Sequence, residues 1–131
     1  MNRKNNLILL IEDNQICQKV TKRQLELLGY SVEVVDAAKP GIALIKRKVY
    51  SVIITDLSLP DLSGEEVIKA VRSSQLSRFT PLIMHTAQET FNEKQYYLEL
   101  GVDVFLTKPV SSENLKKSIQ ETIKKYKLKT E

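Results

Sequence analysis

The fold is decided by residues 51–61, which read SVIITDLSLPD. The first part of this stretch is apolar and β-branched, which is typical of a buried strand. The apolar run stops at a carboxylate, Asp56, and is followed by loop residues that include Pro60. Because ligands bind at the carboxyl ends of the strands in open α/β sheets, Asp56 is predicted to lie where the chemistry takes place.

Segments of two kinds alternate on both sides of this stretch. Strands are predicted at residues 7–11, 30–35, 51–55, 81–86 and 103–106, and helices at 14–28, 40–48, from 63 onward, 89–100 and 111–126. Strands that alternate with helices are joined by right-handed crossovers into a parallel sheet covered on both faces. The sequence therefore predicts the α/β class. We expect a single domain over residues 1–131, with its core in about 6–126 and a doubly wound five-stranded parallel sheet with five helices.

Two details of the helices follow from local patterns. In the helix at 14–28, Ile16, Val20 and Leu27 fall on one stripe, which is predicted to be its apolar face. Ser63 followed three residues later by Glu66 matches a capping box, in which each side chain bonds the backbone N–H of the other residue. The two patterns predict how one helix faces the sheet and where another begins.

Composition and charge exclude several classes of protein. With 42% hydrophobic and 27% charged residues, the chain is not expected to be disordered. The formal charge of +4 owes much to lysines of the last helix, which we interpret as a solvated face, and no cluster indicates direct nucleic-acid binding. Cys17 is the only cysteine, which excludes an internal disulfide, and the apolar run at 7–11 is too short for membrane insertion. A cytoplasmic protein is predicted.

Polar side chains stand where the predicted strands stop. They are Glu12, Asp13, Asp56, Thr86 and Lys108. Because parallel strands end at one edge of the sheet, these groups are expected to converge. Three carboxylates repel one another unless a cation neutralises them, and oxygen ligands suit a hard cation, so Mg²⁺ is the predicted cofactor.

This combination favours phosphoryl transfer. Asp56 is the candidate nucleophile, which would form an acyl phosphate. A metal held by Asp13 and Asp56, with Glu12 acting through water, would offset the charge of the phosphoryl oxygens. Lys108 and the Thr86 hydroxyl would bind the remaining oxygens. Taken singly, Asp13 also fits a helix N-cap and Lys108 a surface lysine, but their joint position at strand ends favours the site.

The motifs at the strand ends resemble those of a known family. Over nearly its full length the chain is similar to the receiver domain of two-component response regulators. The similarity rests on the acidic pair at 12–13, the segment DLSLPDLSG at 56–64, the segment HTA at 85–87 and the segment FLTKP at 105–109. The region 12–20 is most similar to receivers attached to hybrid histidine kinases.

The resemblance implies a site and a fold. Asp56 would be the phosphoacceptor, and a sensor histidine kinase or a histidine phosphotransfer protein would be the donor. Mg²⁺ would be bound by Asp13, Asp56 and the backbone carbonyl of Ser58, with Glu12 in its water shell. The strand order would be 2-1-3-4-5, as in flavodoxin-like sheets.

The family also implies a switch. Thr86 would move toward the phosphoryl group and Phe105 would turn inward, which reshapes the face made by the fourth helix, fifth strand and fifth helix. Phe105 replaces the tyrosine common at this position and cannot donate a hydroxyl hydrogen bond. Ser58 and Gln88 would set the lifetime of the acyl phosphate, and the Lys108–Pro109 peptide bond would be cis.

Such a chain would be a signalling domain rather than an enzyme, because it would catalyse only its own phosphorylation and dephosphorylation. Besides the donor, the resemblance implies a downstream protein target or covalently attached domains. The reshaped face could also form a homodimer.

Other interpretations remain open at this point. The main alternative is a phosphatase or phosphotransferase with an aspartyl nucleophile on a similar sheet, but such enzymes carry a second aspartate where this chain has Ser58. A flavin-binding module needs a glycine-rich phosphate loop after the first strand, where Glu12 and Asp13 would repel an anion. A degenerate receiver that only docks partners is disfavoured because all the site residues are present. His85, the only histidine, is interpreted as a packed strand residue rather than a phosphate carrier.

Overall fold

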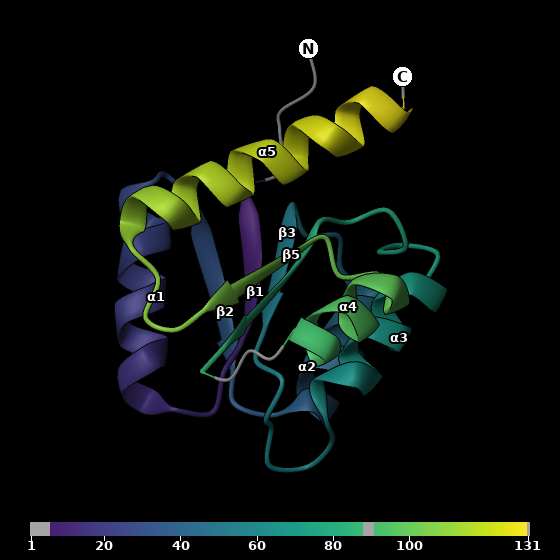
Figure 1. Ribbon diagram of the computed structural model, residues 1–131, viewed down its shortest axis with the longest axis horizontal. Helices are drawn as coiled ribbons and strands as arrows, with labels where there is room; N and C mark the ends of the chain where they lie inside the picture. Colours follow the sequence, from purple (N-terminus) through teal and green to yellow (C-terminus); the bar gives the residue numbers. More distant parts are fainter. Residues whose placement is uncertain (1–5, 88–90, 131) are drawn as a thin grey trace.

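Parallel strands form one sheet in the computed structural model, which describes residues 6–87 and 91–130 (Figure 1). The strands are β1 (Leu7–Ile11), β2 (Ser31–Val35), β3 (Val52–Thr55), β4 (Leu82–Thr86) and β5 (Val104–Thr107). The helices are α1 (Gln15–Leu27), α2 (Ala38–Arg47), α3 (Gly64–Ser73), α4 (Phe91–Leu100) and α5 (Ser112–Thr130). The spatial order β2-β1-β3-β4-β5 confirms the predicted fold class and strand order.

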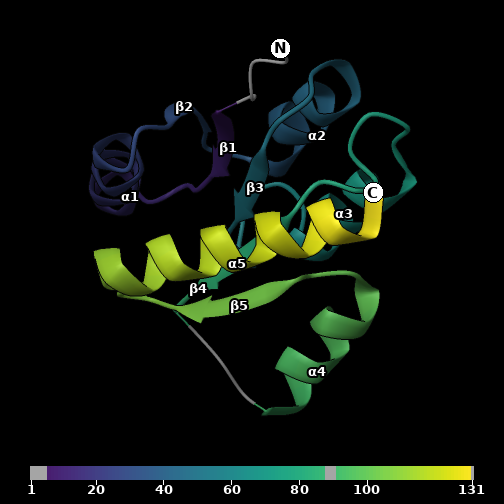
Figure 2. The same ribbon diagram turned by 90° about the horizontal axis from the view of Figure 1, so that it is seen from above.

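The helices cover the sheet in two layers. Helices α1 and α5 lie on one face, and α2, α3 and α4 lie on the other (Figures 1 and 2). Alternate residues of the central strands feed the two halves of the core, so that Leu9 and Ile53 face α2 to α4 while Ile8 and Ile54 face α1 and α5. Strands buried on both faces explain the unbroken apolar runs in the sequence.

The register of the two central strands determines where the acidic residues meet. Ile11 of β1 pairs with Thr55 of β3, and the backbone N–H of Asp56 donates to the carbonyl oxygen of Ile11 at 3.0 Å. The residues that follow the two strands therefore leave the sheet side by side. Within the described part of the chain, no helix is long and apolar enough to cross a membrane.

Most predicted boundaries lie within one residue of the observed ones. Strands β2 to β5 each begin one residue later than predicted. Helix α5 continues to Thr130, beyond the predicted end at Tyr126. The predicted start of the fourth helix at Glu89 lies outside the described residues, and α4 is described from Phe91.

The predicted apolar face of α1 was wrong. Ile16 and Leu27 are 74% and 73% exposed, and Val20 is 54% exposed. The buried residues of this helix are Thr21 and Leu25, and Leu25 packs into the core layer under α1 and α5. Both sets of residues have helical spacing, so the pattern fixed the helix but not which of its two stripes meets the sheet.

The predicted capping box of α3 was also wrong in its side-chain bonds. Ser63 is the N-cap residue with extended backbone angles, but within the described residues its side chain makes no capping hydrogen bond. The first turn is closed by the backbone instead, since the N–H of Glu66 donates to the carbonyl oxygen of Ser63 at 3.1 Å. The carboxylate of Glu66 lies 3.7 Å from the ammonium of Lys69, on the outer side of the helix.

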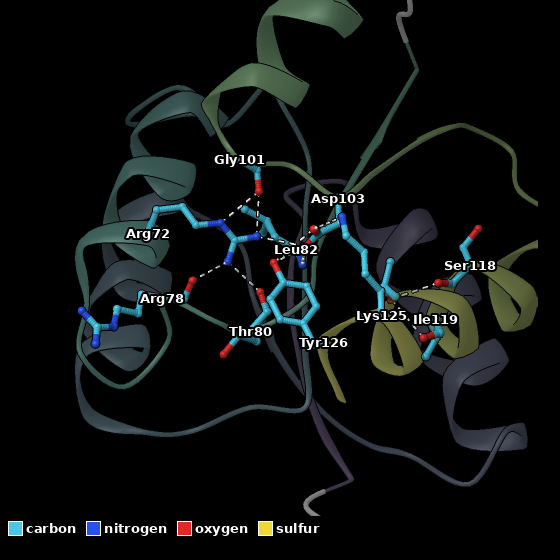
Figure 3. Close-up of polar contacts among 11 residues, drawn as sticks. Arg72, Arg78, Thr80, Leu82, Gly101, Asp103, Ser118, Ile119, Lys125 and Tyr126 are labelled. Atoms are coloured by element: carbon cyan, nitrogen blue, oxygen red, sulfur yellow. Dashed lines mark hydrogen bonds and ion pairs between the residues drawn. The ribbon is translucent and has the colours of Figure 1, made fainter. Parts of the chain in front are cut away.

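A polar cluster joins the helices to the sheet at the edge where β4 and β5 begin (Figure 3). Its centre is Arg72, near the end of α3. The guanidinium makes five hydrogen bonds, equal to the number of its N–H groups. Two go to the carbonyl oxygen of Gly101, one each to those of Arg78 and Thr80, and one to the carboxylate of Asp103 at 3.0 Å.

Asp103 is the second centre of this cluster, and its side chain is only 7% exposed. It accepts hydrogen bonds from the backbone N–H of Leu82 and from the hydroxyl of Tyr126, both at 2.9 Å, and lies 3.4 Å from the ammonium of Lys125. Because Lys125 and Tyr126 belong to α5, the cluster holds the end of that helix against β4 and β5. We call Arg72, Asp103, Lys125 and Tyr126 the amino-edge cluster.

Candidate functional site

The structure brings together the side chains that the sequence places at the strand ends. Glu12 and Asp13 follow β1, Asp56 follows β3, Thr86 ends β4 and Lys108 follows β5. Glu12, Asp56 and Thr86 are buried, whereas Asp13 is exposed. We call Glu12, Asp13, Asp56 and Lys108 the carboxyl-edge cluster.

One ammonium connects two of the buried carboxylates. The Nζ atom of Lys108 lies 2.6 Å from Oδ2 of Asp56 and 2.5 Å from Oε1 of Glu12. The side chain of Lys108 is 13% exposed, so these bonds form where water screens charges weakly. Lys108 is therefore part of the site rather than a surface lysine.

Burial and charge set the protonation of Glu12 and Lys108. Desolvation raises the pKa of Glu12, with a further contribution from the charge of Asp56, against the bond from Lys108. Desolvation alone would lower the pKa of Lys108, but its bonds to Asp56 and Glu12 outweigh this effect and raise it. Lys108 consequently remains an ammonium at neutral pH.

The carboxylates fit a cation site. One oxygen atom from each of Glu12, Asp13 and Asp56 lies within 4.8 Å of the others. Three carboxylates face one ammonium in this cluster, so negative charge is in excess. Carboxylate oxygens are ligands of hard divalent cations, and the exposed Asp13 leaves the cluster open to solvent.

The loop after β3 approaches Asp56 closely. The backbone N–H of Ser58 donates to Oδ1 of the Asp56 carboxylate at 3.2 Å. Gly64, the first residue of α3, lies so near the strand end that a Cβ atom there would be 2.6 Å from the carbonyl oxygen of Asp56. A glycine is therefore required where the start of α3 meets the candidate phosphoacceptor.

The predicted switch residues lie next to this site. Thr86 is 2% exposed, and its carbonyl oxygen accepts a hydrogen bond from the backbone N–H of Lys108 at 2.7 Å. Phe105 already points into the core, since it is only 7% exposed and its ring lies 6.4 Å from that of Tyr97. Gln88 lies outside the described residues.

His85 is a packed strand residue, as its sequence context indicates. It is 4% exposed, and neither ring nitrogen has a hydrogen-bond partner among the described residues. Burial, and then the charge of Lys108, lowers its pKa to about 4. The imidazole is therefore neutral at neutral pH.

Sequence reasoning missed an apolar groove of about 390 Å³ beside the site. It runs from Ile16 and Val20 of α1 to Lys108 and Pro109, whose peptide bond is cis as the resemblance implied. The available signal was the pair of apolar residues four apart in α1, which the structure leaves exposed.

Sequence reasoning also missed the structural role of Asp61, which stands within the segment at 56–64. Its carboxylate accepts hydrogen bonds from the backbone N–H groups of Ala38 and Lys39, both at 2.8 Å. Asp61 therefore caps the first turn of α2, whose own N-cap residue, Ala37, has no polar side chain.

Solved structures with the same fold include signalling domains. The receiver domain of the sensor histidine kinase PA1611 from Pseudomonas aeruginosa, which holds a magnesium ion in its active site cleft, is 30% identical with a TM-score of 0.84. The match covers 92% of this chain and 98% of that one. A CheY-like receiver domain protein from Methanospirillum hungatei is 28% identical with a TM-score of 0.86, over 96% and 99% of the two chains.

Curated relatives point in the same direction. The uncharacterized transcriptional regulatory protein YkoG of Bacillus subtilis is 32% identical over 95% of this chain and 54% of its own length. The response regulator ArlR of Staphylococcus saprophyticus is 30% identical over 90% and 52%. The chain thus spans about half the length of these relatives. The model of the response regulator receiver domain matches residues 8–120, and the chain belongs to this family.

Proposed function

We propose that this chain is a phosphoacceptor domain that receives a phosphoryl group from a phosphohistidine on Asp56. The observation that carries the proposal is the position of Lys108 between the Asp56 and Glu12 carboxylates, beside the exposed Asp13. In the transfer, an Asp56 carboxylate oxygen bonds to phosphorus, the P–N bond of the donor breaks, and the freed imidazole takes up a proton. The product is an acyl phosphate.

The residues of the carboxyl-edge cluster fit Mg²⁺, which is coordinated in the active site cleft of the Pseudomonas aeruginosa receiver domain. We infer that Asp13, Asp56 and the Ser58 carbonyl would hold it, with Glu12 acting through water. The ion would supply positive charge to the phosphoryl oxygens. Lys108 would turn from the carboxylates to the same oxygens.

The remaining roles follow from position. The Thr86 hydroxyl is proposed to bind a phosphoryl oxygen, and Thr86 with Phe105 to change the face formed by α4, β5 and α5. Ser58 and Gln88 are proposed to control the access of water to the acyl phosphate and thereby its lifetime. The resulting state is read by a downstream target, by attached domains or by a second copy of the chain through that face.

The donor is proposed to be a sensor histidine kinase or a histidine phosphotransfer protein that docks over the groove beside Lys108. Ile16, Val20 and Leu27 are exposed along one stripe of α1, with spacings of four and seven residues. Helices pack on one another through stripes of this kind. Lys19 and Arg23 add exposed positive charge on the same helix, which favours a donor with an acidic helical surface.

We also infer that residues 1–131 form one domain with its core in about 6–126, and that it works in the cytoplasm. A single sheet with a core layer on each face supports the first inference. The second is consistent with the lone, half-buried Cys17. As a signalling domain, the chain would act chemically only on its own aspartyl phosphate.

Labelling of the purified chain tests the proposal. With Mg²⁺ and acetyl phosphate or phosphoramidate, the wild type is expected to gain one phosphoryl group, seen by mass spectrometry of the intact protein. Asp56→Asn is expected to abolish the label because the nucleophilic carboxylate is gone. Asp36→Asn, at an exposed aspartate that follows β2, is the matched control and should label normally. Undiminished labelling of Asp56→Asn would contradict the assignment.

A further inference from the structure

Tyr97 of α4 lies between two parts of the site that are far apart in the sequence. Its ring packs against Phe105 of β5, with centroids 6.4 Å apart and planes inclined by 30°. Tyr97 also lines a hollow of about 460 Å³, formed otherwise by the loop between β3 and α3, including Ser58 and Leu59. Among the described residues that line this open hollow, Tyr97 is the one that does not belong to the loop.

The beginning of this loop is hydrogen-bonded to the side chain of Asp56. The N–H of Ser58 donates to the Asp56 carboxylate at 3.2 Å, two residues from the candidate phosphoacceptor. A phosphoryl group on Asp56 would replace the carboxylate by an acyl phosphate and thereby change the charge of the group to which the Ser58 N–H donates. Any resulting movement of the loop changes the hollow against which Tyr97 rests.

Tyr97 is also joined to the start of β5 through its backbone. Its carbonyl oxygen accepts a hydrogen bond from the N–H of Val102 at 3.1 Å, in the tight turn between α4 and β5. Val102 lies three residues before Phe105. A displacement of Tyr97 is therefore transmitted to β5 by the backbone as well as by the ring contact.

Phe105 has little room left for an inward rotation. It is buried in the core between α4 and β5, at 7% exposure, and it carries no hydroxyl group. The partly buried phenol at this junction belongs to Tyr97, and burial, followed by the charges of Glu65 and Glu93, raises its pKa, so it remains neutral. Tyr97 is thus a second aromatic group at the junction of the loop, α4 and β5, beside Phe105.

The neighbouring Tyr96 provides a contrast on the same helix. It is 47% exposed, and its hydroxyl donates to the carboxylate of Glu65 in α3 at 2.7 Å. Glu65 is in turn paired with Lys69 at 3.1 Å. The hydroxyl of Tyr96 thus joins α4 to α3, whereas Tyr97 contacts the loop and β5, and the two rings meet edge to face with centroids 5.1 Å apart.

We propose that Tyr97 is a positioning residue that couples the β3–α3 loop to α4 and β5, so that occupation of Asp56 moves its ring and with it the α4–β5 face. The proposal rests on the function proposed above for Asp56. Coupling is reciprocal: if occupation of Asp56 displaces Tyr97, a change at Tyr97 must alter the affinity of Asp56 for a phosphoryl group or its mimic.

Fluorine NMR of the whole chain labelled with 3-fluorotyrosine tests the movement directly. The probe is beryllofluoride with Mg²⁺, whose bound fluorine signals report occupation of Asp56 independently of the tyrosines. The resonance of Tyr97, assigned by its loss in Tyr97→Phe, is expected to shift on occupation by more than its linewidth. Those of Tyr50 and Tyr126, remote from the hollow, are expected to stay in place.

Affinity measurements separate positioning from packing. Tyr97→Ala is expected to change the apparent affinity for beryllofluoride by about fivefold or more. Tyr97→Phe keeps the ring and should remain within about twofold of the wild type. The same is expected of the matched control Tyr96→Phe, which removes the bond to Glu65 but keeps the ring that packs on Tyr97. If Tyr97→Ala fails to fold, Tyr97→Leu takes its place.

The outcomes are distinct. Bound beryllofluoride signals together with an unmoved Tyr97 resonance would overturn the role of Tyr97 and leave the function of Asp56 intact. Equal affinities of wild type and Tyr97→Ala would do the same. Absence of bound beryllofluoride would overturn the function of Asp56 and this inference with it.

Discussion

The two edges of the sheet each hold a basic side chain among oxygen atoms, but the hydrogen bonds and charges are balanced at one edge and not at the other. In the amino-edge cluster, Arg72 makes five hydrogen bonds and the buried Asp103 accepts from three elements of the fold. In the carboxyl-edge cluster, one ammonium, Lys108, serves two carboxylates, and Asp13 adds a third. One network is saturated, and the other has negative charge left over.

This difference separates a network that is complete within the chain from one that fits a ligand. Both clusters contain partly buried ion pairs, so the presence of such pairs does not identify the site. The carboxyl edge differs because its negative charges outnumber its positive charge and because solvent reaches it at the exposed Asp13. A saturated network gains nothing from a ligand, whereas an unsaturated one binds the ion or group that completes it.

The largest effect is expected from breaking the saturated network. Arg72→Met should lower the free energy of unfolding by about 3 kcal/mol, because it leaves backbone carbonyls and the buried Asp103 carboxylate without a donor. Lys108→Met is the matched control at the other edge. It should cost less than about 1 kcal/mol in the presence of Mg²⁺, since the cation and protonation of Glu12 offset the lost charge. Urea unfolding followed by circular dichroism measures the free energy of unfolding of both variants. Equal losses would show that the two clusters do not differ in how they stabilise the fold.

A second test concerns His85, which has no partner among the described residues at the carboxyl edge. Its pKa is lowered to about 4 in the folded chain, from 6.5, so the unfolded chain takes up a proton first as the pH falls. Stability should therefore be lost from pH 6.5 toward pH 4, by about 2 kcal/mol on reaching pH 5. Urea unfolding at several pH values should show the slope in the wild type. A slope of the same size in His85→Leu would exclude the histidine as its cause.

Two glycines allow the edges to be compared directly. Gly64→Ala should cost about 1.5 kcal/mol and also slow labelling by acetyl phosphate, because the added Cβ meets the backbone of Asp56. Gly101, with a φ of 126°, contacts the side chain of Arg72. Gly101→Ala should reduce stability but leave the labelling rate of the folded protein unchanged. Unchanged labelling in Gly64→Ala would show that the approach of α3 does not position Asp56.

The smallest effect is expected from neutralising Asp13 at the carboxyl edge. Without Mg²⁺, Asp13→Asn should raise the free energy of unfolding by about 0.5 kcal/mol, because it relieves repulsion among three like charges. The same exchange at the amino edge, Asp103→Asn, should lower stability, because Arg72 loses its ionic partner. Addition of Mg²⁺ should stabilise the wild type more than Asp13→Asn. Destabilisation by Asp13→Asn in metal-free buffer would show that the carboxyl edge carries no excess charge.

The sequence predicted the fold and the position of the site for one reason. The candidate side chains lie at or just after the ends of the strands, and parallel strands bring such positions to one edge, so Glu12, Asp56 and Lys108 could be placed without knowing their contacts. The bridging position of Lys108 could not be predicted, because it depends on side-chain directions that the strand pattern leaves open.

Features that depend on tertiary packing were not accessible from local patterns. Arg72 and Asp103 are 31 residues apart, and neither stands in a motif that pairs them. The orientation of α1 was predicted wrongly because Ile16 and Val20 have the same helical periodicity as the buried Thr21 and Leu25. Tyr97 gave no signal because its significance arises only from the contact with Phe105 and the hollow near Ser58.

Lys108 already supplies a counter-ion to the carboxylates at this edge. Its ammonium is a counter-ion tethered to the chain, at 2.6 Å from Asp56 and 2.5 Å from Glu12. A divalent cation would be bound in exchange for this contact. Its apparent affinity would therefore be the difference between the attraction of the carboxylates for the cation and their attraction for the Lys108 ammonium. Under the proposed function, the displaced ammonium would remain close enough to Asp56 to meet a phosphoryl group there.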